Sequence, residues 1–173
     1  DYFKKELINA LKIVNGGHIT INKMTGSWAG AMGQCQFMPS SFINYATDWD
    51  KDGSKNIWTS KPDVFASAAN YLNRVGWSDK ITWGRKVFIG NYKGKINEKK
   101  YNLLSYWASN GILKSNREKL PNVRLKARLI VPDGYKNYGY LAYKNFDSLL
   151  NWNRSNYFAI AVGTLADSIK ENN

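Results

Sequence analysis

The period of the hydrophobic residues changes twice along the chain, and this change constrains the fold more than any other feature. Near both ends, apolar side chains recur every three or four residues, as on one face of an α-helix. From about residue 77 to 143 they instead form short runs separated by Gly and Pro, as in β-strands. We therefore expect an α+β, mainly α, protein with a helical core and a small β-rich insert.

Three segments have a clear helical period. The first, residues 2–14, is stopped by Gly16–Gly17; the second runs from Pro62 to Gly76; and the third, 155–171, begins at a capping serine. Each helix should bury one apolar face. The residues expected on these faces are Phe3, Leu7, Ala10, Leu11 and Val14, then Phe65, Ala68, Ala69, Leu72 and Val75, and finally Phe158, Ala161, Val162, Leu165 and Ile169.

Shorter elements complete the expected organisation. Short helices are predicted over 39–46 and about 103–109, and strands in the runs RKVFIG, VRLKARLIV and GYLAYKNF, with a turn at Pro132-Asp133-Gly134. The predicted domains are a helical core over 1–76, a β-rich insert over 77–143, and a C-terminal helical segment over 144–173 that returns to the core.

Composition limits the possible partners. The net charge of +12 favours an acidic partner, although the base composition of a gene explains a Lys-rich chain equally well. The 7 Trp and 11 Tyr suit flat ligands such as sugar rings or bases. A single Cys and a single His exclude a disulfide framework and a His/Cys zinc site. A nucleic-acid binder is a distant alternative, because no nucleic-acid motif accompanies the charge.

An acidic loop follows the helix predicted over 39–46. Asp48, Asp50 and Asp52 alternate before Gly53, so three carboxylates would converge at a sharp turn and attract a hard cation. The carbonyl of Ser54 falls where a calcium loop uses its backbone. Position twelve, Thr59, cannot provide the usual bidentate carboxylate, so Asp63 would close a longer loop over 48–63. The sequence predicts a calcium site here; the alternative is a solvated acidic turn.

The segment GSWAGAMGQCQFMPSSF, residues 26–42, is rich in small residues. Glycine permits the backbone to approach a ligand closely. Ser27, Gln34 and Gln36 provide neutral hydrogen-bonding groups of the kind that hold hydroxyl and acetamido groups. These features suit a substrate cleft, whereas composition alone is equally compatible with a tight loop.

The runs GSWAGAMGQCQFMPSSFINYATDWDKDGSKNIW, ASAANYLNRVGW and NWNRSNYFAIAVGTLAD closely resemble the lytic murein transglycosylase B family, in order and over nearly the whole chain. The resemblance implies a lysozyme-like fold with a variant EF-hand loop. It implies cleavage of the MurNAc–GlcNAc β-1,4 bond of peptidoglycan glycan strands with formation of 1,6-anhydro-MurNAc. It also implies a location in the bacterial periplasm or cell envelope, with membrane attachment only through an upstream N-terminal lipid anchor.

The resemblance also implies site residues. Ser27, Gln36, Tyr71 and Asn153 match substrate-binding positions and are expected to face one groove. Trp152 stands where the family has Tyr, and it keeps a ring for stacking but lacks the hydroxyl.

The family uses one Glu as general acid and then general base. The chain has four glutamates, and none lies in the family's E-T/S-x-x-G motif: Glu6, Glu98, Glu118 and Glu171. Glu6 is expected to be a solvated partner of Lys4 and Lys5. The catalytic Glu is therefore expected upstream of residue 1, and the chain alone is expected to be inactive. The alternative is a non-catalytic peptidoglycan-binding module.

Overall fold

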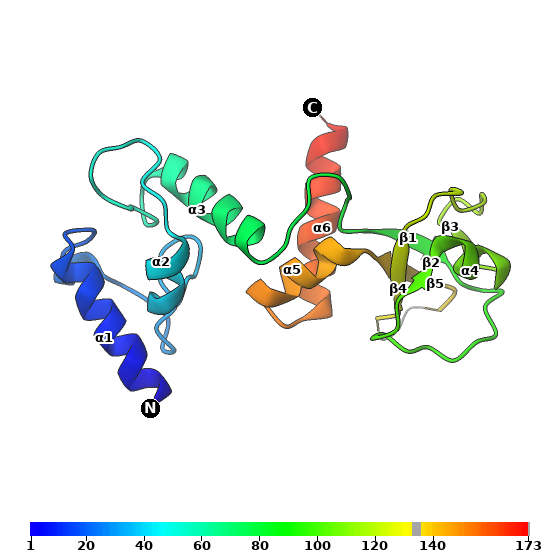
Figure 1. Cartoon of the computed structure of the whole chain (residues 1–173), viewed down its shortest axis with the longest axis horizontal. Helices are drawn as coiled ribbons and strands as arrows, with labels where there is room; N and C mark the ends of the chain where they lie inside the picture. Colours follow the sequence, from blue (N-terminus) through cyan, green and yellow to red (C-terminus); the bar gives the residue numbers. More distant parts are fainter. Residues whose placement is uncertain (133–135, 173) are drawn as a thin grey trace. The chain divides into compact units, whose positions relative to one another are not determined.

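The computed structural model describes residues 1–132 and 136–172, so Asp133 and Gly134 of the predicted turn lie outside the described residues. The helices in the described part are α1 (Tyr2–Asn15), α2 (Pro39–Tyr45), α3 (Lys61–Arg74), α4 (Leu104–Ser109), α5 (Lys144–Trp152) and α6 (Asn156–Glu171), with a 3₁₀ turn η1 (Ile21–Lys23). The strands are β1 (Gly84–Phe88), β2 (Asn102–Leu103), β3 (Leu113–Lys114), β4 (Lys126–Ile130) and β5 (Tyr138–Ala142) (Figure 1). The predicted α+β, mainly α, class is confirmed.

The chain divides into two compact units, Asp1–Val75 and Gly76–Asn173. The first unit contains α1, η1, α2 and α3, and the second contains the sheet with α4, α5 and α6. The division into a helical core over 1–76, an insert over 77–143 and a C-terminal segment over 144–173 stays a prediction. The predicted return of residues 144–173 to the helical core stays a prediction.

The helix ends lie close to where the sequence places them. α1 ends at Asn15, directly before Gly16, and Gly76 after α3 has a φ of 99°. A left-handed residue after a helix is the usual reason for glycine there. Ser60 caps α3 by accepting a hydrogen bond from the Asp63 N–H at 3.4 Å, and Pro62 occupies the first turn.

The predicted apolar faces of the three long helices are wrong. On α1 the buried residues are Glu6 and Ile13, whereas Phe3 and Leu7 are each 61% exposed. On α3 the buried residues are Asp63, Ser67 and Tyr71, and on α6 they are Ala159, Ile160 and Gly163. Periodicity locates a helix, but the neighbouring segment decides which side is buried.

The buried faces of α3 and α6 contain polar and small residues because of the groups that these faces contact. Ser67 of α3 accepts a hydrogen bond from the Thr47 N–H at 2.9 Å, so this face of α3 satisfies the backbone of the preceding loop. On α6, a Cβ at Gly163 would come within 2.3 Å of the Trp83 ring. Only glycine permits this contact between helix and indole.

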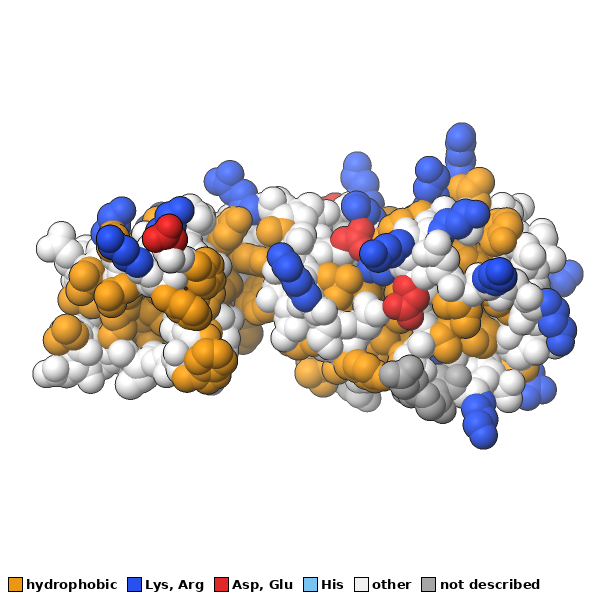
Figure 2. All heavy atoms as spheres, turned by 90° about the horizontal axis from the view of Figure 1, so that it is seen from below, with side chains coloured by type: hydrophobic (Ala, Val, Ile, Leu, Met, Phe, Trp, Pro, Cys, Tyr) orange, Lys and Arg blue, Asp and Glu red, His pale blue; other side chains and the backbone are white. Residues whose placement is uncertain are grey.

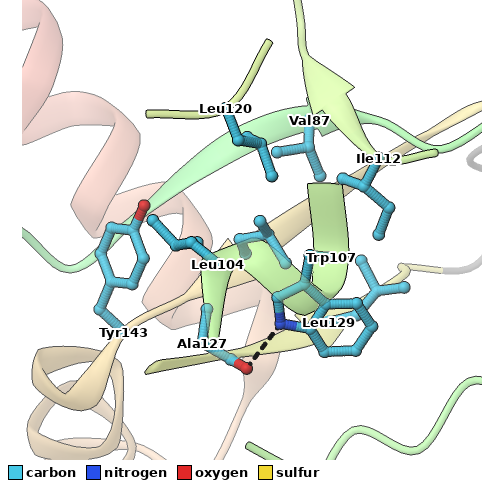
Figure 3. Packing of buried hydrophobic residues seen from close by; sticks show 9 residues of the cluster. Val87, Leu104, Trp107, Ile112, Leu120, Ala127, Leu129 and Tyr143 are labelled. Atoms are coloured by element: carbon cyan, nitrogen blue, oxygen red, sulfur yellow. Dashed lines mark hydrogen bonds between the residues drawn. The ribbon is translucent and has the colours of Figure 1, made fainter. Parts of the chain in front are cut away.

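The five strands form one antiparallel sheet in the order β2-β4-β5-β1-β3. Central pairs include Val87 with Gly139 and Leu129 with Leu141. One face packs on α4, where the Trp107 indole N–H donates to the Ala127 carbonyl at 2.9 Å within an otherwise apolar cluster (Figure 3). Trp83, just before β1, connects this part of the chain to α6. Its indole N–H donates a hydrogen bond to Asp167 of α6 at 2.9 Å.

The sequence predicted the run GYLAYKNF as one strand, and this prediction is wrong. β5 ends at Ala142, Tyr143 precedes α5, and Lys144 begins that helix. The very short strands β2 and β3 were also not predicted, because two-residue strands leave no alternation in the sequence. No helix in the part of the chain that the structure describes is long and apolar enough to span a membrane.

Candidate functional site

The Gly-rich segment folds back on itself as two tight turns. The Ser27 N–H donates to the Ala31 carbonyl at 2.8 Å, and the Ser27 hydroxyl oxygen accepts from the Ala31 N–H at 3.1 Å. Isolated bridges then pair Gly26 with Met32 and Met32 with Phe37. Ser27 is therefore an exposed hydroxyl on a loop whose backbone is held by its own hydrogen bonds.

Gly33 permits a close backbone approach, but the partner is the chain itself. Its φ is 63°, and a Cβ there would lie 2.7 Å from the Ile57 carbonyl oxygen. Gln34 completes this junction, because its N–H donates to the Ile57 carbonyl and its side-chain amide to the Trp58 carbonyl, both at 2.9 Å. Gly33 and Gln34 thus attach the Gly-rich loop to Ile57 and Trp58, which follow the acidic loop.

Tyr71 is buried in an aromatic contact with the residue that follows Gln36, whereas Gln36 itself is exposed. Phe37, the residue after Gln36, has its ring centroid 5.6 Å from that of Tyr71, and Tyr45 contacts Tyr71 edge-on at 4.8 Å. Burial raises the pKa of Tyr71, and the neighbouring Tyr45 raises it further. The Tyr71 hydroxyl thus ionises at a higher pH than that of an exposed tyrosine.

A cavity of about 320 Å³ separates α1 from the loop over residues 24–32. Its lining includes Glu6, Ser27, Trp28 and Met32. Trp28 is 95% exposed, and Figure 2 shows orange hydrophobic side chains gathered on the face of the first unit that it displays. Of the predicted substrate residues, only Ser27 lines this cavity.

Glu6 is not the solvated partner of Lys4 and Lys5 that the sequence suggested. It is buried, and its two carboxylate oxygens accept hydrogen bonds from the Ser40 N–H at 2.8 Å and the Ser40 hydroxyl at 2.7 Å. The carboxylate thereby caps the first turn of α2 from another helix. The sequence signal that could have revealed this is the P-S-S start of α2, which offers uncapped N–H groups.

Three carboxylates of the acidic loop converge, and they are Asp48, Asp50 and Asp63 rather than the alternating three. Oxygens of Asp48, Asp50 and Asp63 all lie within 4.8 Å of one another. Asp63, fully buried in the first turn of α3, accepts hydrogen bonds from the Trp49 and Asn56 N–H groups, both at 2.7 Å. These bonds fold the loop around its closing carboxylate.

Asp48 has one paired and one unpaired carboxylate oxygen. Its Oδ2 accepts from the Gly53 N–H at 3.0 Å, but its Oδ1 is buried with no hydrogen-bond partner among the described residues. A buried, unpaired carboxylate oxygen is costly unless a cation or proton compensates it. The donor set therefore fits a hard cation such as calcium, which prefers oxygen ligands.

The structure places Asp52 outside this group of three. Its Oδ1 accepts from the Ser54 N–H at 2.8 Å, and the Ser54 hydroxyl donates to the His18 carbonyl at 3.1 Å. Gly53 has a φ of 92°, which confirms the sharp turn predicted there. The acid alternation alone could not show which of the four carboxylates converge.

Trp152 and Asn153 belong to the second unit. Trp152 is the last residue of α5, and the Asn153 N–H donates to the Leu149 carbonyl at 3.1 Å, which closes the helix. The Ser155 hydroxyl then accepts from the Phe158 N–H at 3.3 Å and caps α6. The two residues therefore occupy a corner between two helices. The shared groove for Asn153 and the residues of the first unit stays a prediction.

Comparison with known proteins defines the class of protein. Residues 1–167 match the family described as Transglycosylase SLT domain. The chain is 34% identical over 176 residues to the membrane-bound lytic murein transglycosylase B of Escherichia coli (strain K12), covering 98% of this chain and 46% of that protein. The chain therefore belongs to the lytic transglycosylase family, and the predicted family is confirmed.

Solved structures of lytic transglycosylases are also similar to this chain. SltB3 from Pseudomonas aeruginosa, in complex with NAG-anhNAM-pentapeptide, is similar with a TM-score of 0.87 and 38% identity over 96% of this chain and 45% of that one. Escherichia coli Slt35, in complex with calcium, has a TM-score of 0.80 and 30% identity over 99% of this chain and 54% of that one. The chain spans about half the length of these relatives.

Proposed function

We propose that the chain binds peptidoglycan glycan strands as part of an enzyme that cleaves the MurNAc–GlcNAc β-1,4 bond and forms 1,6-anhydro-MurNAc. We place this activity in the periplasm or cell envelope of a bacterium. The observation that supports it most is the loop that presents Ser27 and Gln36 as exposed hydrogen-bonding groups on a backbone fixed by its own bonds. The similar SltB3 structure contains a peptidoglycan fragment, which agrees with this proposal.

Each proposed substrate residue offers a chemistry suited to sugars. The Ser27 hydroxyl and the Gln36 and Asn153 amides hydrogen-bond hydroxyl and acetamido groups without adding charge. The Tyr71 hydroxyl is protonated at neutral pH, as in any tyrosine, and is a neutral hydrogen-bonding group. Trp152 provides an indole on which the apolar face of a sugar ring can stack.

The proton donor of the reaction is proposed to lie on a segment of the enzyme outside these 173 residues. Glu6 is bonded to Ser40, and Glu98 accepts hydrogen bonds from Val131 and Asn156. Glu118 forms an exposed pair with Lys114 at 2.9 Å, and these bonds lower the pKa of Glu118. A general acid needs the opposite shift, because it must hold its proton near neutral pH.

A calcium ion is proposed in a variant EF-hand loop, held by Asp48, Asp50 and Asp63. The unpaired Oδ1 of Asp48 supports this, and Slt35 was solved with calcium. The ion would neutralise three carboxylates that otherwise repel each other and would fix the loop onto the start of α3. We also assign the Ser54 carbonyl to this site and leave Asp52 to the turn itself.

Binding of NAG-NAM-pentapeptide, measured by calorimetry, tests the proposal. We expect Ser27→Ala and Asn153→Ala each to weaken binding by about tenfold, because each removes one proposed hydrogen bond to the ligand. The exposed Ser115→Ala on the second unit is the matched control and should bind like wild type. No binding by the wild-type chain, or equal binding by all variants, contradicts the assignment.

The nucleic-acid alternative is tested in the same assay. Binding that depends on phosphate contacts falls steeply as salt rises, whereas binding through neutral hydroxyls and amides should not. Figure 2 shows Lys and Arg side chains spread over the visible face of the second unit rather than lining one groove. We expect duplex DNA not to compete with the muropeptide at 0.15 M salt.

A further inference from the structure

We infer that Glu98, in the segment between β1 and β2, is a positioning residue that fixes the corner holding Trp152 and Asn153. The inference rests on the proposed role of these two residues in substrate binding. It assigns a specific task to the β-rich part of the chain, whose connection to the substrate site the sequence did not reveal.

Glu98 accepts hydrogen bonds from three other residues of the second unit. Its Oε2 accepts a hydrogen bond from the Asn156 amide at 3.0 Å, and its Oε1 accepts from the Val131 N–H at 3.2 Å. Its backbone carbonyl accepts from the Arg128 guanidinium at 2.7 Å. Since Asn156 is the first residue of α6 and Arg128 lies in β4, one glutamate ties the start of α6 to the sheet.

Arg128 connects the same point to α5. It is only 7% exposed, and its second guanidinium nitrogen lies 3.0 Å from Asp147 in the first turn of α5. Asp147 also accepts hydrogen bonds from the Tyr101 hydroxyl at 3.0 Å and from Lys144 at 2.8 Å. A buried cation with a paired carboxylate is rigid, because separating the pair leaves an uncompensated charge.

Both helices that flank the Trp152–Asn153 corner are thus attached to β4. Arg128 holds α5 through Asp147, and Glu98 holds α6 through Asn156. Only residues 153–155 separate the two helices. Movement of either helix therefore changes the direction of the Asn153 side chain, and an error of about 1 Å in such a residue is costly for binding or catalysis.

A charge-matched pair of substitutions tests this positioning role. Asn156→Asp alone places a second carboxylate against Glu98, and the repulsion should displace the corner. An acidic residue at the start of a helix otherwise stabilises that helix, so a loss cannot come from weaker capping. Combining Asn156→Asp with Glu98→Gln restores both bonds, because the amide can donate to the new carboxylate and accept from the Val131 N–H.

The readout is the dissociation constant for NAG-NAM-pentapeptide, measured by calorimetry with a melting curve for each variant. We expect Asn156→Asp to weaken binding about tenfold and the double variant to return to within about twofold of wild type. Glu118→Gln, which breaks only an exposed pair, is the control and should bind normally. Recovery of the melting temperature without recovery of binding would show a purely structural role and overturn the inference.

Two further outcomes separate this inference from the proposed function. Normal binding by Asn156→Asp, with Asn153→Ala defective, overturns the role of Glu98 and leaves the substrate site intact. If the wild-type chain does not bind the muropeptide at all, the proposed function fails, and the positioning role fails with it.

Discussion

The role of Glu6 depends on its neighbours in the fold rather than on its neighbours in the sequence. In sequence it stands beside two lysines, yet in the structure its two oxygens accept hydrogen bonds from Ser40. Such a bond between α1 and the start of α2 could not be predicted, because the pairing spans 34 residues and leaves no local pattern. Phe3 and Leu7 show the converse, since they follow a helical period but are exposed.

We predict that Glu6→Ala lowers the free energy of unfolding by about 1–3 kcal/mol, because the partly buried Ser40 N–H and hydroxyl lose their acceptor. Urea denaturation followed by circular dichroism measures the loss. Glu118→Ala, which removes an exposed carboxylate, should leave the urea midpoint unchanged. Equal effects of the two substitutions would contradict the cap assigned to Glu6.

Cys35 provides a pH-dependent prediction. Burial raises the pKa of its thiol from 9.0 to about 11, so the folded state holds this proton more tightly than the unfolded state. Stability should therefore be unaffected below the unfolded pKa and should fall as pH rises from about 9 to about 11. Urea midpoints across this pH range measure the fall in stability. In the Cys35→Ala variant, the stability should fall less over the same pH range, because the contribution of the thiol is removed. Rapid alkylation of the folded protein at pH 8 would argue against the buried thiol.

At the scale of elements, the sequence predicted where the helices and main strands lie but not which sides they bury. Gly and Pro residues mark element ends locally, so Pro62 and Gly76 predicted the bounds of α3 to within two residues. The buried side of α3 depends instead on the loop it meets, which needs Ser67 and Asp63 as hydrogen-bond acceptors. Likewise, the alternation of aspartates predicted a cation site, but only the folded loop shows that Asp52 lies outside the group of three.

The acidic loop gives the element-scale prediction. Adding calcium should raise the melting temperature, and chelation should lower it, because a ligand that binds only the folded state stabilises it. Asp48→Asn should abolish the calcium-dependent shift, whereas Asp52→Asn should retain it. Differential scanning fluorimetry with and without chelator makes the comparison. A melting temperature that calcium does not change in the wild-type chain rules out the proposed site.

At the scale of the whole molecule, the chain is a member of the lytic transglycosylase family that spans about half of its relatives. Its two units each hold some of the proposed substrate residues, Ser27, Gln36 and Tyr71 in the first and Trp152 and Asn153 in the second. All five were predicted from the family pattern, and their role in substrate binding stays a prediction. The network of Glu98 and Arg128 was not predictable, because its members come from separate strands and loops.

Digestion of purified sacculi, with products identified by mass spectrometry, tests the central claim most directly. General acid–base help contributes about 10²- to 10⁴-fold, and Ser, Gln and Asn cannot supply the proton at neutral pH. We predict that the 173-residue chain binds sacculi but releases no 1,6-anhydromuropeptides, whereas a version extended upstream releases them. Release of these products by the chain itself, abolished by Glu6→Gln or Glu98→Gln, would contradict the account.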